Sequence, residues 1–151
     1  MSEDLIEQLL DKEYIVVDFL PEQVPADSKG RFFSVEHLFL QEPRISALRS
    51  NFSNIILKLY CYYEIQVFDL TADKCSGNPE PVLLDEWIRS NQCDLQILLE
   101  NTSEDALEDT LIVIAKDDTH MTVYNPSDRI TKLLRTLAAA EGLFVWNPLS
   151  H

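Results

Sequence analysis

The fold is decided by residues 110–124, which read TLIVIAKDDTHMTVY. Two apolar runs within this stretch, Thr110–Lys116 and His120–Tyr124, have the β-branched and aromatic composition that is typical of strands. The three residues between them, Asp117, Asp118 and Thr119, have side chains that favour turns. The stretch therefore predicts a hairpin of two antiparallel strands.

A third strand is predicted immediately before the hairpin, over Asp94–Glu100. Parallel neighbours need a connection of about a dozen or more residues, usually a helix, and residues 94–124 lack helix-length crossovers. These strands should therefore be antiparallel. Further strands are predicted over Tyr14–Leu20, Tyr62–Leu70 and Leu143–Trp146, whereas the proline-containing segments 21–30 and 71–81 are predicted loops.

Two amphipathic helices provide the apolar faces that would cover the sheet. The first begins at Pro43 and ends near Tyr60, and one face carries apolar residues at helical spacing: Ile45, Leu48, Phe52, Ile55, Ile56 and Leu59. The second follows Ser127, a suitable N-cap, and ends before Gly142, a suitable residue to follow a helix. Shorter helices are predicted over residues 2–12, 34–40 and 82–91.

Helices and strands in this order predict an α+β fold. We expect a single globular domain over residues 1–151, with a mostly antiparallel sheet of about five strands and helices packed on one face. The length suits one domain of roughly 100–200 residues, and 46% hydrophobic residues exclude a wholly disordered chain.

The charge excludes whole classes of partner. The chain has 26 acidic and 12 basic residues, a formal net charge of −14. Phosphate backbones and anionic lipid surfaces are repelled by such a chain, and no apolar run approaches the roughly 20 residues that span a bilayer. We therefore expect neither nucleic-acid nor membrane binding.

The acidity includes a dense run between two predicted strands. It is either a solvated, solubilising surface or a docking face for a basic protein, and the candidate partner-binding residues are Glu100, Glu104, Asp105, Glu108 and Asp109.

Motifs for catalysis, metals and cofactors are missing from the sequence. Three glycines cannot form the familiar phosphate loops, and there is no H-E-x-x-H motif, no calcium-loop pattern and no G-x-S-x-G elbow. No catalytic residue, metal ion or cofactor is therefore predicted. Asp117, Asp118 and His120 offer oxygen and nitrogen ligands within four residues, and are either a ligand or metal site or simply a polar hairpin tip.

The cysteines and the N-terminus predict a cytoplasmic protein. Cys61, Cys75 and Cys93 are odd in number and contain no C-x-x-C pair. Residues 1–4, Met-Ser-Glu-Asp, lack the basic and apolar regions of a secretory signal.

Two hypotheses for the function follow. The first is a non-catalytic interaction domain that binds a basic protein through its acidic face, resembling immunity or inhibitor proteins in size and charge only. The alternative is a small-molecule-binding domain or enzyme, with a pocket between sheet and helices that is lined by tyrosines and the Asp117–His120 tip. Oligomeric state is left open by the sequence.

Overall fold

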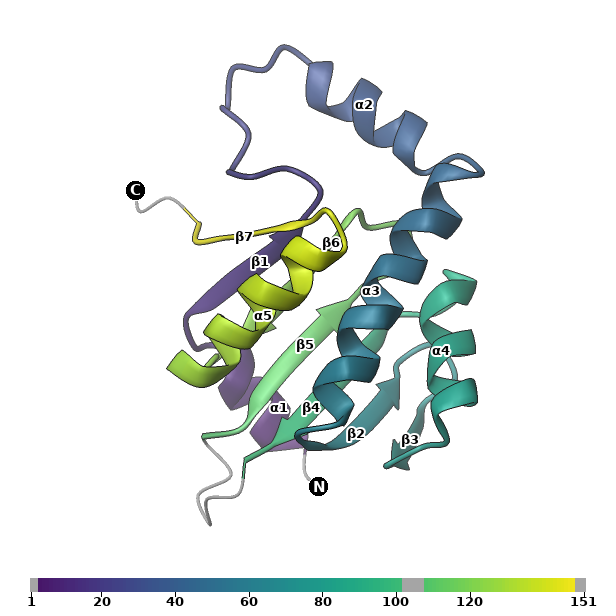
Figure 1. Cartoon of the computed structure of the whole chain (residues 1–151), viewed down its shortest axis with the longest axis vertical. Coiled ribbons are helices and arrows are strands. Elements are labelled where there is room, and N and C mark those ends of the chain that lie inside the picture. Colours follow the sequence, from purple (N-terminus) through teal and green to yellow (C-terminus); the bar gives the residue numbers. More distant parts are fainter. Residues whose placement is uncertain (1–2, 102–107, 149–151) are drawn as a thin grey trace.

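The computed structural model describes residues 3–101 and 108–148. Within these residues the chain forms five helices and one seven-stranded sheet (Figure 1). The elements in chain order are α1 (Glu3–Leu10), β1 (Tyr14–Asp18), α2 (Arg31–Phe39), α3 (Arg44–Tyr60), β2 (Glu64–Asp69), β3 (Lys74–Gly77), α4 (Pro81–Ser90), β4 (Leu95–Glu100), β5 (Thr110–Ile114), β6 (His120–Tyr124), α5 (Asp128–Ala140) and β7 (Phe144–Trp146).

The strands are ordered β3-β2-β4-β5-β6-β1-β7, and every neighbouring pair is antiparallel. The predicted hairpin forms β5 and β6 near the centre of this sheet, with Ile112 opposite Val123. The α+β class and the antiparallel sheet are thus confirmed, with seven strands instead of about five. The strand that the sequence did not indicate is β3, an exposed edge strand without an apolar alternation, which pairs only with β2 among the described strands.

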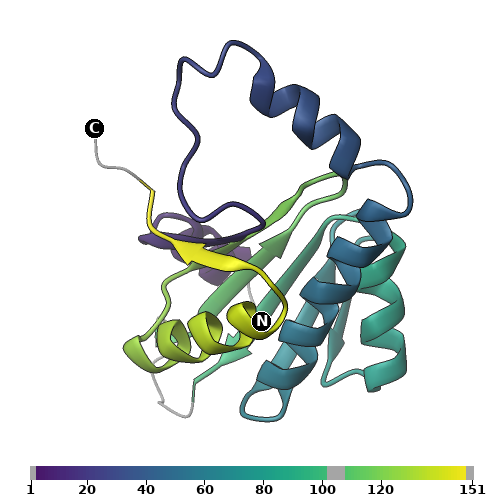
Figure 2. The ribbon, with the colours of Figure 1, turned by 45° about the horizontal axis from the view of Figure 1, so that its top comes forward.

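One face of the sheet is covered by α3, α4 and α5 (Figures 1 and 2). The predicted apolar face of α3 is buried, and Phe52 at its centre is fully buried. In the strands, alternate residues such as Ile15 and Val17 point into this core because successive side chains of a strand face opposite sides. Ser127 caps α5 as predicted, since its hydroxyl oxygen accepts a hydrogen bond from the Ile130 N–H at 3.1 Å.

On the opposite face of the sheet, a helix covers only some of the strands. There α1 packs on β4 and β5, and Leu9 forms a small second core with Leu98 and Leu111. The prediction that helices lie on one face is therefore incomplete, because the central strands are apolar on both sides and need a cover on each. Over β7, β1 and β6 no described helix covers this face.

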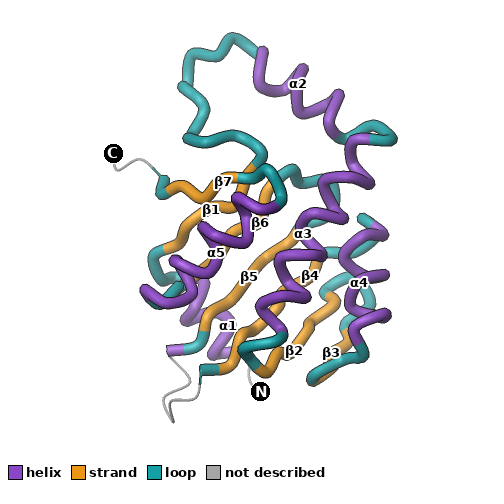
Figure 3. Tube along the Cα trace, viewed as in Figure 1, coloured by secondary structure: helices purple, strands orange, loops and turns teal. Residues whose placement is uncertain are grey.

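The segment between β1 and α3 stands away from the sheet (Figures 1 and 3). None of the nine residues of α2, Arg31–Phe39, is buried. The helix begins three residues before the predicted Ser34: Gly30, with a φ of 81°, is its N-cap, and the Ser34 N–H donates to the Gly30 carbonyl at 3.1 Å. Phe39 stacks on Phe19 with 4.4 Å between ring centroids, and this contact joins α2 to the end of β1.

None of the helices in the described ranges has the length and apolar character needed to cross a membrane.

Candidate functional site

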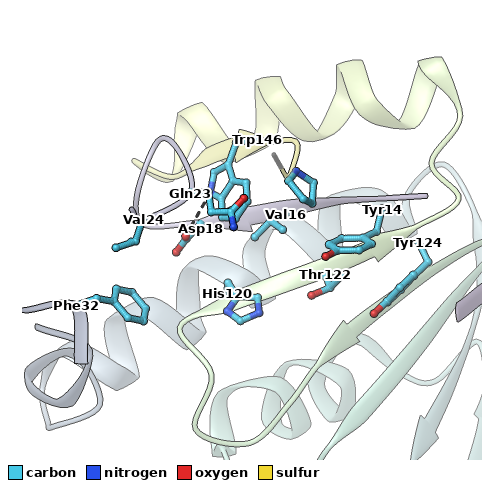
Figure 4. Close-up of a pocket in the computed structure, with 11 residues that line it drawn as sticks. Tyr14, Val16, Asp18, Gln23, Val24, Phe32, His120, Thr122, Tyr124 and Trp146 are labelled. Carbon is cyan, nitrogen blue, oxygen red and sulfur yellow. Dashed lines mark hydrogen bonds between the residues drawn. The ribbon is translucent and has the colours of Figure 1, made fainter. Parts of the chain in front are cut away.

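A hollow of about 360 Å³ lies on the sheet face that α3, α4 and α5 leave open (Figure 4). We call it the aromatic groove. Its floor is formed by β1 and β6, and its walls come from β7, the segment after β1 and the start of α2. The lining residues are Tyr14, Val16, Asp18, Gln23, Val24, Phe32, His120, Thr122, Tyr124, Trp146 and Pro148.

The register of β1 against β6 assembles the floor. Tyr14 lies opposite Tyr124, Val16 opposite Thr122, and Asp18 opposite His120. These six side chains share one face because residues i, i+2 and i+4 of a strand point the same way. The intervening residues of β1, Ile15 and Val17, point into the core on the other side and hold this register in place.

Asp18 is the buried charge of the groove. Only 7% of the residue is exposed. Its Oδ1 accepts the Phe19 N–H at 2.8 Å, and its Oδ2 accepts the Trp146 indole N–H at 3.3 Å. Burial raises the pKa of the Asp18 carboxyl, and these hydrogen bonds offset part of that rise. A carboxylate held in this way favours a cationic partner, because water solvates it incompletely.

Aromatic rings line the groove on either side of this carboxylate. Tyr14 and Tyr124 contact each other across the strands, with 5.4 Å between ring centroids and 47° between ring planes. Burial raises the pKa of the Tyr124 hydroxyl, and the neighbouring Tyr14 adds to the rise. Trp146 lies over Asp18 from β7, and Phe32 closes the far end (Figure 4). Ring faces attract cations through their negative quadrupole, so rings and carboxylate favour the same charge on a ligand.

The hairpin tip does not form the predicted three-residue site. Asp117 turns away from the groove: its N–H donates to the Asn91 side-chain oxygen at 2.9 Å, and its carboxylate accepts from the Asn91 amide at 3.0 Å. His120 Nε2 lies 4.0 Å from Asp118 Oδ2, and burial raises the pKa of the Asp118 carboxyl. Of these three residues, His120 alone lines the groove.

A metal site is not formed by these residues either. Within residues 3–101 and 108–148, no three His, Cys, Asp or Glu side chains are grouped so that they could hold a metal ion. The geometry therefore gives no support to a metal site at Asp117, Asp118 and His120, and their role in binding another ligand stays a prediction. This hollow is not the predicted pocket between sheet and helices, since it lies on the sheet face opposite α3, α4 and α5. Tyr14, Tyr124 and His120 do line it.

The predicted acidic docking residues have different surroundings. Glu104 and Asp105 lie outside the described residues. Asp109 is only 6% exposed and its carboxylate accepts the Asn101 N–H at 2.7 Å, so we correct the prediction for Asp109: it holds the chain between β4 and β5 instead of facing a partner. Glu100 accepts a hydrogen bond from the Gln66 amide at 3.0 Å, and Glu108 is exposed.

Asp18 and Trp146 are the groove residues that sequence reasoning missed. The available signal was the alternation of Tyr14, Val16 and Asp18 within a predicted strand, which places an acid on the same face as a tyrosine. That signal does not reveal that a strand 128 residues later brings the indole N–H onto the carboxylate.

No protein-family model matches this chain, and searches of curated proteins and of solved structures found no match.

Proposed function

We propose that this protein is a non-catalytic binding domain that takes a positively charged group of a basic partner into the aromatic groove. The observation that carries this proposal is the buried Asp18 carboxylate, which accepts the Trp146 indole N–H in a groove lined with aromatic residues. The partner's cation would supply the charge that Asp18 faces in the groove, and the rings would enclose its apolar stem.

The charge of the whole chain supports the same class of partner. A net charge of −14 raises the local concentration of basic molecules and accelerates their association. The long-range field brings a basic partner to the surface, whereas the groove selects the group that is bound. The first effect weakens with salt, and the second is less screened because Asp18 is buried.

The affinity for one isolated cation is expected to be low. A hydrogen bond to a charged group contributes about 1.5–3 kcal/mol and a cation–π contact about 0.5–2 kcal/mol. Burial of the four methylenes of a lysine stem adds about 3 kcal/mol and association costs at least about 4 kcal/mol, so the balance reaches about −4 kcal/mol at best, a dissociation constant in the millimolar range. A tight complex needs further contacts from a larger partner.

The test is a titration with Nα-acetyl-lysine methylamide, followed by the fluorescence of Trp146 in a Trp87→Phe background. We expect saturable binding in the millimolar range, and at least tenfold weaker binding of the uncharged norleucine analogue. Asp18→Asn should abolish the difference between the two compounds. Glu86→Gln removes the same charge from an exposed position on α4 and is the matched control. Equal binding of both compounds by the unaltered groove would refute the proposal.

The acids at the end of β4 and before β5 offer a second surface for a basic partner, with Glu108 exposed and Glu100 half-buried. Glu100 and Glu108, with Glu104 and Asp105 outside the described residues, retain the predicted role of a docking face. Capture of a basic partner should then weaken sharply between low and high salt. Replacing these four residues with their amides should remove most of this salt dependence.

A small-molecule or enzymatic role is favoured by one observation, the His120 imidazole that lines the groove 4.0 Å from the Asp118 carboxylate. A histidine near a carboxylate can serve proton transfer once the two groups come within hydrogen-bond distance. If this role holds, an uncharged or anionic metabolite should raise the melting temperature, and His120→Gln should abolish that shift while Asp18→Asn preserves it.

A further inference from the structure

The aromatic groove has two chemically different parts along β1. One part is the buried Asp18 carboxylate, which accepts the Trp146 indole N–H at 3.3 Å. The other part lies two residues earlier, over Val16 and its register partner Thr122. Val16 and Asp18 line the same hollow, because residues i and i+2 of a strand point to the same face. The groove is therefore one site with an acidic part and an uncharged part.

Aromatic residues flank the uncharged part on both sides. Val16 pairs with Trp146 on β7. Two residues earlier on β1, Tyr14 pairs with Tyr124 on β6. Val16 lies between Trp146 and Tyr14 (Figure 4), and it and Thr122 have smaller side chains than the flanking residues. An aromatic side chain over this floor would contact the faces or edges of the flanking rings, as aromatic pairs prefer. We call the region over Val16 and Thr122 the ring subsite.

The charge of the groove is placed at one end of it. Asp18 is the one carboxylate among the described residues that line the hollow. The tyrosines beyond the ring subsite are accessible to a partner, since Tyr14 is 42% exposed and Tyr124 is half-buried. Their hydroxyls, with that of Thr122, can donate to or accept from a peptide backbone. A ligand that matches the groove therefore has a single cation beside an aromatic group.

The spacing of the two parts matches an extended peptide. Asp18 and Val16 are two residues apart, which at about 3.3 Å per residue is roughly 7 Å. In an extended peptide the residues i and i+2 point the same way at the same spacing, whereas residue i+1 points away. Such a peptide lies across the sheet face, since β1 already pairs with β6 and β7 on its two edges.

We infer that the aromatic groove binds an extended segment of a basic partner protein in which one residue separates a Lys or Arg from an aromatic residue. The cation faces Asp18 and the ring occupies the ring subsite. Charge complementarity to Asp18 and to the net charge of −14 makes the partner basic. This inference rests on the proposed function and adds the second side chain and its spacing.

The test follows the indole N–H signal of Trp146 by NMR while peptides are added to the protein, with the Trp87 signal assigned by Trp87→Phe. The probes are Ac-Lys-Ala-Phe-amide and Ac-Phe-Ala-Lys-amide, because the groove sets the spacing and not the direction. Their isomers are Ac-Lys-Phe-Ala-amide and Ac-Ala-Phe-Lys-amide, whose rings point away when the lysine faces Asp18. We expect the tighter probe to bind at least tenfold more tightly than its isomer, which has the same composition and charge.

Variants assign each side chain of the probe to its place. Asp18→Asn should make the probe and its norleucine analogue bind equally. Tyr14→Ala should reduce the gain of the probe over its isomer to within twofold, and Tyr14→Leu, which also lacks the ring, should do the same if the alanine variant does not fold. Tyr62→Ala is the matched control, because it removes a tyrosine that is 55% exposed outside the groove, and it should leave the gain unchanged.

The outcomes separate this inference from the proposed function. If lysine peptides bind at Asp18 but the position of the ring changes nothing, the inference is refuted and the proposed function stands. The same holds if Ac-Lys-Ala-Ala-Ala-Phe-amide binds as tightly as the probe, because the ring then needs no two-residue spacing. If no lysine peptide binds at millimolar concentration, or if the norleucine analogue binds as tightly as the probe to the unaltered protein, both are refuted.

Discussion

Replacing Trp146 with phenylalanine tests whether Asp18 is held as an ionised carboxylate in the groove. The substitution keeps an aromatic ring but removes the indole N–H that donates to Asp18 Oδ2 at 3.3 Å. Hydrogen bonds to charged groups contribute about 1.5–3 kcal/mol, and this one is longer than the usual 2.7–3.2 Å range, so we expect about 1 kcal/mol from it. The smaller ring costs further packing energy that does not depend on pH.

The contribution of the hydrogen bond has a defined pH dependence. Burial raises the pKa of Asp18, whereas the Phe19 N–H, the nearby His120 and the Trp146 N–H lower it, because each stabilises the charged form. Trp146→Phe should therefore raise the pKa of Asp18 further. The stability that the hydrogen bond adds is present above the folded-state pKa of Asp18 and is lost as the pH falls through it.

The measurement is a double-mutant cycle of Trp146→Phe and Asp18→Asn by urea unfolding, followed by circular dichroism. A coupling energy of about 1 kcal/mol is expected at pH 7, and it should vanish below the ordinary carboxyl pKa of 3.8. Carbon-13 NMR of the Asp18 carboxyl measures the pKa in the folded state, without unfolding. A coupling that is absent at pH 7, or that persists unchanged in acid, would refute the reasoning.

Three further substitutions test other parts of the fold. Ser127→Ala removes the N-cap of α5 and should destabilise the protein by about 1 kcal/mol in urea unfolding, whereas Ser127→Asp keeps a capping oxygen and should retain the stability. Arg49→Met removes a fully buried guanidinium that donates to two backbone carbonyls, and leaving both unpaired should cost about 2–3 kcal/mol; an unchanged urea midpoint would contradict this. Asp85→Asn removes a carboxylate whose pKa is lowered by hydrogen bonds from Arg89 and Ser53, so its destabilisation should be present above pH 3.8 and disappear as the pH falls through the lowered pKa; equal loss at pH 7 and in acid would disprove the assignment.

Buried Arg49 illustrates what composition cannot show. The apolar face of α3 was readable from its spacing, but Arg49 lies within the same helix and is fully buried. Its Nε donates to the Ile88 carbonyl at 2.8 Å and its Nη1 to the Ala115 carbonyl at 3.3 Å. Burial lowers its pKa. These acceptors lie 39 and 66 residues away, so nothing local distinguishes Arg49 from a solvated arginine.

The acidic residues show the same limit in the opposite direction. Asp109 was predicted to lie on an exposed acidic surface and Asp18 lay in a predicted strand without a site role, and both are buried with carboxylates that accept backbone N–H groups. Glu13, equally acidic in sequence, is exposed. Asp18 ends β1, whereas Glu13 and Asp109 precede β1 and β5, so position at a strand end does not decide burial, and the chain packed around each acid does.

The sequence alone determined the class of the fold, the β5–β6 hairpin, the buried face of α3 and the cap of α5. The fold class follows from the order of the elements, and each of the other three features depends on residues within about fifteen positions of one another. The strand order, the partly covered second face and the groove were decided only by the tertiary structure. Pairing β1 between β6 and β7 brings Asp18 to His120 and Trp146 across more than 100 residues of chain. No local pattern contains that information, because register across distant strands is set by the packing of the whole core.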